Sequence, residues 1–465
     1  MNKSRIERDS MGEVKVPTTA LYGAQTQRAI NNFNASGQPM PKRFVTALLD
    51  IKACAALANQ ELQQISTDMT DAINKAVESL KSKKDLMTHF PVDVYQTGSG
   101  TSSNMNANEV IATLANRILE EKGSQDRVGA NDHVNYGQSS NDIIPTTIHV
   151  SSAIGLERDL IPALEYLSSI IDSKSSQLEG IVKTGRTHLM DAMPIRMTQV
   201  LDAWRGQIEL SIKRIRNIQP QLQTLALGGT AVGTGINAHP EFSRTFNKFL
   251  EQRTGIAFRS AKNFFTHIGS QDIAVALSGE LKALAIAIMK ISNDLRWMNS
   301  GPLAGLGEIT LEALQPGSSI MPGKVNPVAP EAAAMAVARV IGNDSTIAVA
   351  GQSGNFELNV MLPVIGDSLL QSIRLLSNVS RLLADKAILS FQVNENKLAE
   401  SLNRNPILVT ALNPIVGYEK AASIAKKAYQ EKRAIVDVAH ENTELSRSEL
   451  EDLLDPRKLA DGGIK

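Results

Sequence analysis

Residues 317–327 read Gly-Ser-Ser-Ile-Met-Pro-Gly-Lys-Val-Asn-Pro and stand between segments that have a helical apolar pattern. Gly317 and Gly323 allow the backbone to adopt positive φ or to approach a ligand closely. Pro322 and Pro327 prevent a continuous helix, since proline has no N–H to donate and its ring clashes with the preceding turn. The stretch is therefore predicted to form a loop between helices.

Outside this loop, helical periodicity dominates the chain. Apolar residues recur at helical spacing over residues 369–383, and similar stripes run through residues 161–171, 273–295 and 198–225. These segments are long and rich in Ala, Leu and Ile, whereas aromatic residues make up 4% of the chain. The pattern predicts a mainly α fold built around a long central helical bundle.

Small residues surround nearly the whole of the helix predicted for residues 331–340, which reads Glu-Ala-Ala-Ala-Met-Ala-Val-Ala-Arg-Val. Such a helix is expected to be buried on several sides. Since small side chains let helices approach closely, the segment predicts a core that is shared between subunits.

Three regions follow from these patterns. Residues 1–139 mix short elements, loops and helices, and they are predicted to form an N-terminal, mostly helical domain. Residues 140–395 hold the long helices of the predicted central domain. Beyond this region the pattern shortens, with Pro406 and Pro414 interrupting it, so residues 396–465 are expected to form a small C-terminal helical domain.

The charge balance argues against two classes of partner. The chain has 465 residues, of which 48 are Lys or Arg and 48 are Asp or Glu. This balance leaves no global field to attract nucleic acid or an anionic membrane, so neither partner is expected.

The N-terminus has no apolar stretch of the signal-peptide type, and no uncharged segment is long enough to span a bilayer. A soluble cytoplasmic protein is the simplest interpretation.

No metal or organic cofactor is predicted. The single cysteine, Cys54, excludes an internal disulfide and a cysteine metal cage, and its apolar neighbours predict a buried side chain. The histidines outside residues 184–194 have no metal-ligand spacing. The glycine-rich segment 228–235 lacks the Gly-Lys-Ser/Thr ending of a phosphate loop, so a nucleotide site is not expected.

The loop at residues 317–327 has groups that bind a small anion. It can bring the hydroxyls of Ser318 and Ser319, the cation of Lys324 and backbone N–H groups around a carboxylate. The amide of Asn326 adds a further donor. An isolated cluster of this kind would more simply be a polar surface loop with an incidental lysine. The neighbouring segments weigh against that alternative.

Three further polar segments have similar chemistry. They are residues 97–109 (Thr-Gly-Ser-Gly-Thr-Ser-Ser-Asn-Met-Asn-Ala-Asn-Glu), residues 137–142 (Gly-Gln-Ser-Ser-Asn-Asp) and residues 184–194 (Thr-Gly-Arg-Thr-His-Leu-Met-Asp-Ala-Met-Pro). Hydroxyl and amide residues at a helix start can simply cap the helix, but the same geometry presents N–H groups and hydroxyls to an anion. A lone histidine is more often structural. His188 differs because it follows Gly-Arg-Thr in a polar break between long helices, and the near-neutral titration of histidine suits proton exchange with water.

Together these segments resemble the shared motifs of the fumarase/aspartase superfamily of lyases, in the expected order and spacing. The resemblance covers nearly the whole chain and is strongest to class II fumarases. Residues 356–360 (Phe-Glu-Leu-Asn-Val) and 409–413 (Val-Thr-Ala-Leu-Asn) also resemble fumarase segments. The resemblance implies a small dicarboxylate substrate and a homotetramer in which three subunits build each active site.

The resemblance also implies a reaction, the reversible hydration of fumarate to (S)-malate by anti addition of water through a carbanion of aci-carboxylate type. Ser318 would be the base that removes the proton beside a carboxylate, and His188 with Glu331 and a water would act at the hydroxyl end. Lys324 and Asn326 would hold the carboxylate that takes up the charge. The residues implied in substrate binding are Ser99, Gly100, Thr101, Ser139, Ser140, Asn141, Thr187, Ser319, Lys324, Val325 and Asn326.

Two features depart from the usual fumarase pattern. Many fumarases have His-Pro-Asn-Asp at an accessory anion site, whereas residues 129–132 read Gly-Ala-Asn-Asp, so Asn131 and Asp132 remain as a candidate accessory anion site. Val-Ala-Pro at residues 328–330 is closer to aspartases, which typically have glutamine at the position of His188. Aspartate ammonia-lyase is therefore the alternative within the superfamily, and a noncatalytic helical scaffold is the alternative outside it.

Overall fold

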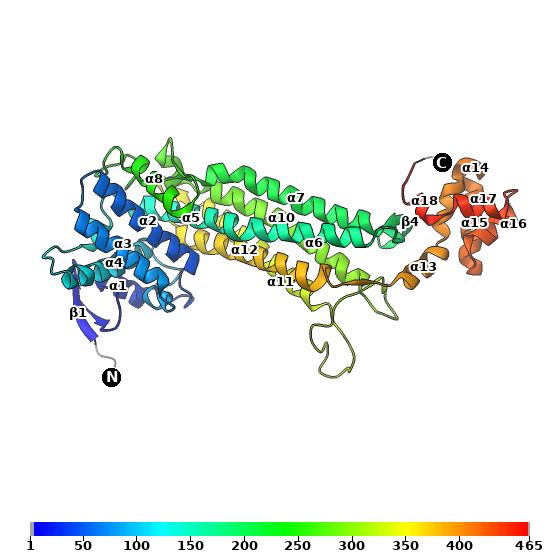
Figure 1. The fold of residues 1–465 in the computed structure, drawn as a ribbon, viewed down its shortest axis with the longest axis horizontal. Coiled ribbons are helices and arrows are strands. Elements are labelled where there is room, and N and C mark those ends of the chain that lie inside the picture. Colours follow the sequence, from blue (N-terminus) through cyan, green and yellow to red (C-terminus); the bar gives the residue numbers. More distant parts are fainter. Residues whose placement is uncertain (1–3, 464–465) are drawn as a thin grey trace. The chain divides into compact units, whose positions relative to one another are not determined.

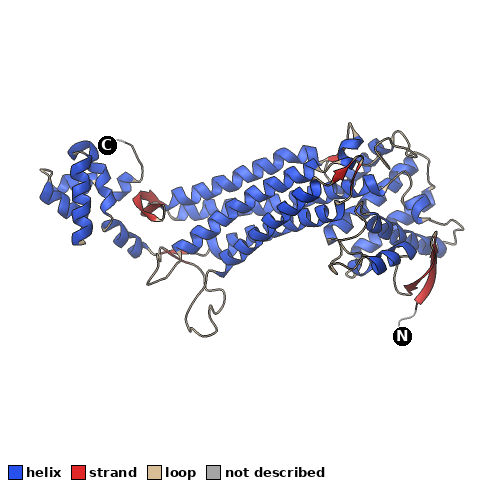
Figure 2. Ribbon diagram, turned by 180° about the vertical axis from the view of Figure 1, so that it is seen from behind, coloured by secondary structure: helices blue, strands red, loops and turns tan. Residues whose placement is uncertain are grey.

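The computed structural model describes residues 4–463, and most of them lie in helices (Figures 1 and 2). The predicted mainly α fold is confirmed. The chain divides into two compact units, while the three domains expected from the sequence stay a prediction. Unit 1 comprises Met1–Pro162, Ser211–Ala285 and Val337–Ser377, and unit 2 comprises Ala163–Leu210, Ile286–Ala336 and Asn378–Lys465.

Five long helices carry the four predicted apolar stripes and the predicted helix of small residues. They are α6 (Ile161–Gln177), α7 (Met197–Leu222), α10 (Asp272–Met298), α11 (Val328–Gly351) and α12 (Leu362–Leu383). Within each unit, the parts of these helices that belong to it lie side by side (Figures 1 and 2). On α12 the predicted stripe is buried, since Leu369, Ile373 and Leu376 are each at most 1% exposed. The apolar periodicity of the sequence therefore located this helix correctly.

Unit 1 contains the N-terminal elements and several later short ones. They are β1 (Ser4–Asp9), β2 (Gly12–Pro17), α1 (Ala24–Asn32), α2 (Lys42–Glu61), α3 (Thr67–Ser82), η1 (Leu86–His89), α4 (Thr101–Glu121), η2 (Ala130–Val134), α5 (Ser140–Gly155), η3 (Leu156–Leu160), β5 (Thr224–Leu225), α8 (Phe242–Thr254), β6 (Arg259–Ser260), α9 (Phe264–Gly269), β8 (Gly354–Asn355) and β9 (Leu358–Asn359). β1 and β2 pair as an antiparallel hairpin, and β5 pairs with β6 in parallel. Helices, with these short strand pairs between them, thus build the unit.

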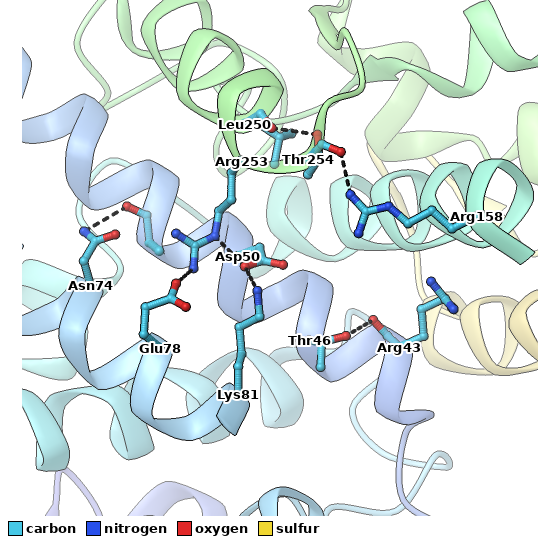
Figure 3. Close-up of polar contacts among 11 residues, drawn as sticks. Arg43, Thr46, Asp50, Asn74, Glu78, Lys81, Arg158, Leu250, Arg253 and Thr254 are labelled. Atoms are coloured by element: carbon cyan, nitrogen blue, oxygen red, sulfur yellow. Dashed lines mark hydrogen bonds and ion pairs between the residues drawn. The ribbon is translucent and has the colours of Figure 1, made fainter. Parts of the chain in front are cut away.

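Helix α2 runs through the core of unit 1. Cys54 is fully buried there, as predicted, and burial raises the pKa of its thiol to about 12. Asp50 joins α2 to two neighbouring helices, because it accepts from Lys81 Nζ on α3 at 2.6 Å and from Arg253 Nε on α8 at 2.5 Å (Figure 3). Arg253 also contacts Glu78 of α3. The charged groups at this point of the core are therefore paired.

His149, on α5, is expected to make the stability of unit 1 depend on pH. The ring is buried, and Nδ1 donates to the carbonyl oxygen of Thr224 at 2.9 Å. Burial, together with the adjacent ring of His267, lowers the pKa of His149 to about 4. The unfolded chain takes up this proton below about pH 6.5 and the folded chain only below about pH 4. The contribution of His149 to stability is fully present above about pH 6.5. The free energy of unfolding is therefore expected to fall by about 3 kcal/mol as the pH drops from about 6.5 to about 4.

Denaturant unfolding at several pH values between about 7 and 4 measures this dependence. His149→Gln keeps a donor for the carbonyl of Thr224 but cannot take up a proton. The variant is therefore expected to lose less stability than the native protein as the pH falls. Equal losses in the two proteins would show that His149 does not carry the dependence.

Unit 2 contains two strand pairs and the C-terminal helices. Its elements are β3 (Val182–Thr187), β4 (Met190–Arg196), β7 (Ile309–Thr310), η4 (Ala384–Ile388), β10 (Gln392–Val393), α13 (Glu395–Asn403), η5 (Pro406–Leu412), α14 (Asn413–Val416), α15 (Tyr418–Glu431), α16 (Ile435–Asn442), α17 (Arg447–Leu453) and α18 (Pro456–Leu459). β3 pairs with β4, and β7 pairs with β10, both antiparallel. The C-terminal helices have a hydrophobic cluster of their own, which includes Leu412, Ile424, Val438 and Leu450.

In a single chain, α11 buries one stripe rather than several faces. Ala333, Val337 and Val340 are buried, whereas Met335 is 70% exposed and Ile341 is 38% exposed. The predicted burial on several sides is therefore not reached within residues 4–463 of one chain, because each of these two side chains stays exposed there. Over residues 4–463, no helix has both the length and the apolar content needed to cross a membrane.

Candidate active site

The segment 317–327 is a loop, as predicted, and it is closed by its own backbone and by Asn326. The Gly317 N–H donates to the carbonyl oxygen of Lys324 at 3.0 Å, and Asn326 Nδ2 donates to the carbonyl oxygen of Gly317 at 2.5 Å. A Cβ at Gly317 would lie 2.1 Å from the carbonyl oxygen of Lys324, so this close approach requires glycine. The amide of Asn326 has a second hydrogen, which remains for a ligand.

Ser318 lies at the start of this loop with its hydroxyl oxygen held by backbone donors. The N–H groups of Ile320 and Met321 donate to Ser318 Oγ at 3.2 Å and 2.9 Å. Two donors on one oxygen favour negative charge on that oxygen, and they leave the hydroxyl hydrogen free to move. Ser318 is half-buried, and the adjacent Ser319 is exposed.

Three of the predicted catalytic residues, Lys324, Asn326 and Glu331, line one cavity of unit 2. The cavity has a volume of about 840 Å³. Val325, another predicted binding residue, also lines it and is 46% exposed. Glu331 stands in the first turn of α11, where negative charge is favourable. The other walls are formed by Asn293, Arg296, Trp297, Asn299, Ser300, Gly301, Pro302, Ile309, Thr310, Leu311, Ala313, Gly323 and Pro327.

His188 lies at the tip of the β3–β4 hairpin, which the sequence interpretation had taken for a polar break between helices. Thr187 pairs with Met190, so His188 and Leu189 form a two-residue turn. Their φ angles are 54° and 62°. Positive φ at both positions matches the right-handed twist of paired strands, although Asn and Gly are the usual residues there. Thr187 and His188 are exposed.

Within one chain, the imidazole of His188 does not meet the predicted partner carboxylate. Among residues 4–463, no hydrogen bond or ion pair joins His188 to Glu331. Strand β3 is instead fixed by Glu308, which accepts from Arg186 Nη1 at 2.7 Å and lies 3.0 Å from Lys183 Nζ. Glu308 was not predicted from the sequence, because no local pattern distinguishes it.

Ser99, Gly100 and Thr101 form the turn into α4 in unit 1. Gly100 has a φ of 72°, and a Cβ on it would lie 2.8 Å from Ile144 Cγ1, so both conformation and packing require glycine. The hydroxyl oxygens of Ser99 and Thr101 are 2.8 Å apart. Gly100, the N-cap residue of α4, has no side chain to cap the helix.

Ser139, Ser140 and Asn141 form the turn into α5. Ser139 caps the helix, because its hydroxyl accepts from the backbone of Asn141 at 3.2 Å and its own N–H donates to Asp142 at 2.9 Å. Asn141 Nδ2 donates to the carbonyl oxygen of Ala231 at 2.7 Å. The alternative of helix capping is thus correct for Ser139. The Ser140 hydroxyl is not one of the capping groups.

The glycine-rich segment 228–235 binds a carboxylate of its own chain rather than a nucleotide. The N–H groups of Gly228 and Thr230 donate to Asp142 Oδ2 at 3.0 Å and 2.8 Å. Asp142 is fully buried, and burial raises its pKa to about 6 despite these donors. The segment therefore fixes the start of α5, and with it the Ser139–Asn141 turn.

A buried polar network brings the α4 and α5 turns together. Asn104 Nδ2, one turn into α4, donates to Ser140 Oγ at 3.0 Å. Lys52, on α2, is 0% exposed and donates to the side chains of Asn135 and Gln138, which lie just before Ser139. These residues were not predicted from the sequence. The signal was a lysine within the apolar run Ile-Lys-Ala-Cys-Ala-Ala-Leu of residues 51–57.

The candidate accessory anion site is exposed at the surface. Asn131 and Asp132 lie in the single turn of η2 and are exposed. His133 Nδ1 accepts from the N–H of Gly129 at 2.8 Å, which fixes the start of this turn. Over residues 4–463, no group of three or more His, Cys, Asp and Glu side chains could hold a metal ion. The accessory site stays a prediction.

Comparison with known proteins identifies relatives over the whole chain. The family described as "Lyase" matches residues 12–342, and the family "Fumarase C C-terminus" matches residues 408–461. The chain is 66% identical over 464 residues to "Fumarate hydratase class II 2" of Pseudomonas aeruginosa, with 100% of each chain covered. It is 55% identical to the class II fumarate hydratase of Xylella fastidiosa, with 100% of this chain and 97% of that chain covered.

A solved structure has the same fold. The recombinant class II fumarase of Schistosoma mansoni matches with a TM-score of 0.95 and 36% identity, and the match covers 98% of this chain and 99% of that chain. The predicted fumarase/aspartase-type fold with its long helices is therefore confirmed. The chain belongs to the class II fumarate hydratase family of lyases.

Proposed function

We propose that this chain catalyses the reversible hydration of fumarate to (S)-malate by anti addition of water. The observation that carries the proposal is the closed loop of residues 317–327, which holds the Ser318 hydroxyl on two N–H donors and contributes Lys324 and Asn326 to the cavity that Glu331 of α11 also lines. Relatives named class II fumarate hydratase, at 66% and 55% identity over this chain, support the same reaction.

The hard step of the reverse direction is the removal of a weakly acidic C–H proton beside a carboxylate. The carbanion spreads its charge onto that carboxylate, which becomes a doubly negative group. Ser318 takes this proton as its alkoxide, and the N–H donors of Ile320 and Met321 stabilise that alkoxide. The cation of Lys324 stabilises it further.

Lys324 and Asn326 hold the carboxylate that takes up the charge. Donors that are already aimed at developing charge contribute several kcal/mol, roughly 3 per contact in known oxyanion sites. Both side chains line the cavity, and Asn326 is oriented by its bond to Gly317 before any substrate binds. Preorganisation of this kind lowers the barrier of the proton-removal step.

At the other end of the double bond, His188 with Glu331 delivers or removes the water. In one chain His188 is exposed at a hairpin tip and forms no hydrogen bond or ion pair with Glu331, so we infer that a second chain supplies one of the two residues. The exposed Met335 on α11 gives an apolar contact for such a partner. We infer a homotetramer in which three subunits contribute the 99–101, 139–141, 187–188 and 318–331 segments to each site.

Two assays test the reaction. Loss of fumarate absorbance is expected with water alone, and addition of ammonium is expected to change neither the rate nor the product. Turnover that requires ammonium would instead identify an aspartate ammonia-lyase. Absence of turnover with either would favour a noncatalytic scaffold.

A cytoplasmic location is part of the proposal, since a lone buried thiol such as Cys54 suits a reducing compartment.

A further inference from the structure

Lys52 is a fully buried lysine that the proposed mechanism does not use. It is 0% exposed on α2, and its Nζ donates to Asn135 Oδ1 and Gln138 Oε1, both at 2.8 Å. A buried lysine is rare unless its hydrogen bonds are satisfied. Both acceptors lie in the segment that leads to the predicted substrate-binding turn at Ser139–Asn141, so the position of Lys52 relates it to that turn.

The bonds of Lys52 fix which way the amide of Asn135 faces. A lysine side chain donates to these acceptors, so the oxygen of Asn135 has to face it. The amide nitrogen of Asn135 accordingly donates to the backbone oxygen of Gln138 at 3.2 Å. The same Oδ1 accepts from Nδ2 of Asn104 and from Nδ2 of Asn108, each at 3.2 Å. One oxygen therefore orients two amides on α4.

The orientation of Asn104 in turn decides the role of the Ser140 hydroxyl. Asn104 Nδ2 faces both Asn135 Oδ1 and Ser140 Oγ, with the second contact at 3.0 Å. Oδ1 of Asn104 has no hydrogen-bond partner in the part of the chain that the structure describes, so the amide is oriented by its nitrogen. Ser140 Oγ thus accepts a hydrogen bond from Asn104 Nδ2, and the hydrogen of the Ser140 hydroxyl remains available to a ligand.

We propose that Lys52 is a positioning residue that, through Asn135 and Asn104, keeps the Ser140 hydroxyl as a donor to the substrate carboxylate. The inference rests on the proposed function, in which Ser140 contacts a dicarboxylate. Such a substrate can only accept, so a hydroxyl that donated its hydrogen inward would repel it.

These hydrogen bonds from Lys52 through Asn135 and Asn104 to Ser140 form a relay. The orientation that the relay gives to the Asn135 amide does not depend on the charge of Lys52. Burial lowers the pKa of this lysine well below its ordinary value, and the carboxylate of Asp142 opposes the shift. The ammonium and the neutral amine both have enough hydrogens to serve the two amide oxygens. Substitution of the side chain by a group without N–H, in contrast, leaves Asn135 free to turn.

A double-mutant cycle tests the relay. Ser140→Ala removes the donor, and it is expected to lower kcat/KM for fumarate about tenfold or more, the loss typical of a hydrogen bond to a charged group. Lys52→Met is expected to lower kcat/KM by a similar factor, mainly through KM. Adding Lys52→Met to Ser140→Ala should then lower it no further, because the hydroxyl that Lys52 acts through is absent. A purely structural role for Lys52 predicts multiplied losses, and that result would overturn the inference.

Lys174→Met is the matched control. Lys174 is also buried, at 8% exposure, and its Nζ donates to the carbonyl oxygens of Leu389 and Phe391 at 3.2 Å and 2.6 Å. It has no contact with a predicted binding segment. The control should therefore lower the unfolding temperature without changing KM. A KM change in Lys174→Met equal to that in Lys52→Met would mean that loss of any buried lysine disturbs the site.

Asn104→Asp tests the same relay if Lys52→Met does not fold. A carboxylate at this position accepts from Ser140 and turns its hydrogen inward, so kcat/KM should fall as in Ser140→Ala. In the Ser140→Ala background the substitution should have no further effect, whereas repulsion between the new charge and substrate would persist there and contradict the inference. These results are distinct from failure of the proposed function, which would be absence of fumarate hydration by the unmodified protein.

Discussion

Replacement of Ser318 with Ala is expected to lower kcat for fumarate hydration by about a thousandfold, the range of a lost general base. KM should stay near its original value, because Lys324 and Asn326 still bind the carboxylate. The reason is the geometry of the loop: the N–H groups of Ile320 and Met321 favour negative charge on this one oxygen. Within residues 4–463, Ser319, the other hydroxyl residue of residues 317–327, accepts no such pair of N–H donors.

Steady-state kinetics of the variant and of a control make the measurement. Ser82→Ala is a suitable control, because the Ser82 hydroxyl is exposed and donates to the Ser79 carbonyl oxygen at 2.8 Å, within a helix of unit 1. It should retain normal kinetics. If Ser318→Ala kept near-normal turnover, Ser318 would be removed from the mechanism, and the base would have to be sought elsewhere.

Replacement of Glu308 with Ala is expected to destabilise the protein by about 3–5 kcal/mol, the usual effect of breaking a buried ion pair. The side chains of Glu308 and Lys183 are only 3% and 6% exposed, so the substitution leaves the lysine buried without its partner. Burial lowers the pKa of Lys183, while the carboxylate of Glu308 opposes that shift. The loss should be measurable as a lower midpoint of urea unfolding at a fixed protein concentration.

Two further variants sharpen this prediction. Combining Lys183→Met with Glu308→Leu removes the buried unpaired lysine and is expected to recover part of the lost stability. The recovery is partial because Arg186 still loses its bond to Glu308 and keeps the ion pair with Asp191, at 3.9 Å. Arg205→Ala breaks an ion pair with Asp172 that is much more exposed, and it should lower stability by less than about 1 kcal/mol. A loss in Glu308→Ala no larger than in Arg205→Ala would contradict the importance of this buried pair.

The hairpin also explains what the sequence could and could not predict. The stripe on α12 and the Gly/Pro loop at 317–327 were predictable, because apolar periodicity and backbone constraints act locally. The β3–β4 hairpin was missed, since its turn is made by His188 and Leu189 rather than by Asn and Gly. Neither strand alternates apolar and polar residues, since β3 reads Val-Lys-Thr-Gly-Arg-Thr and β4 contains a proline.

Residues that act through distant contacts were equally hidden. Glu308 is 122 positions from Arg186, and Lys52 is 83 positions from Asn135, so neither partner is visible from local sequence. The resemblance to known lyases indicated the candidate site residues themselves, but not the residues that position them, such as Glu308 and Lys52. The positioning residues are recognised by their burial and hydrogen bonds, which only the folded chain has.

Co-expression of two inactive variants tests most directly whether different subunits donate Ser318 and His188 to one pocket. Chains with Ser318→Ala and chains with His188→Asn should each be inactive alone, and their mixed assemblies should recover part of the native activity. Mixing Ser318→Ala with Lys324→Met should recover none, because both substitutions damage the same loop and every loop would carry one of them. Recovery by the first pair and not by the second is the predicted result, and failure of the first pair in confirmed mixed assemblies would contradict a site shared between subunits.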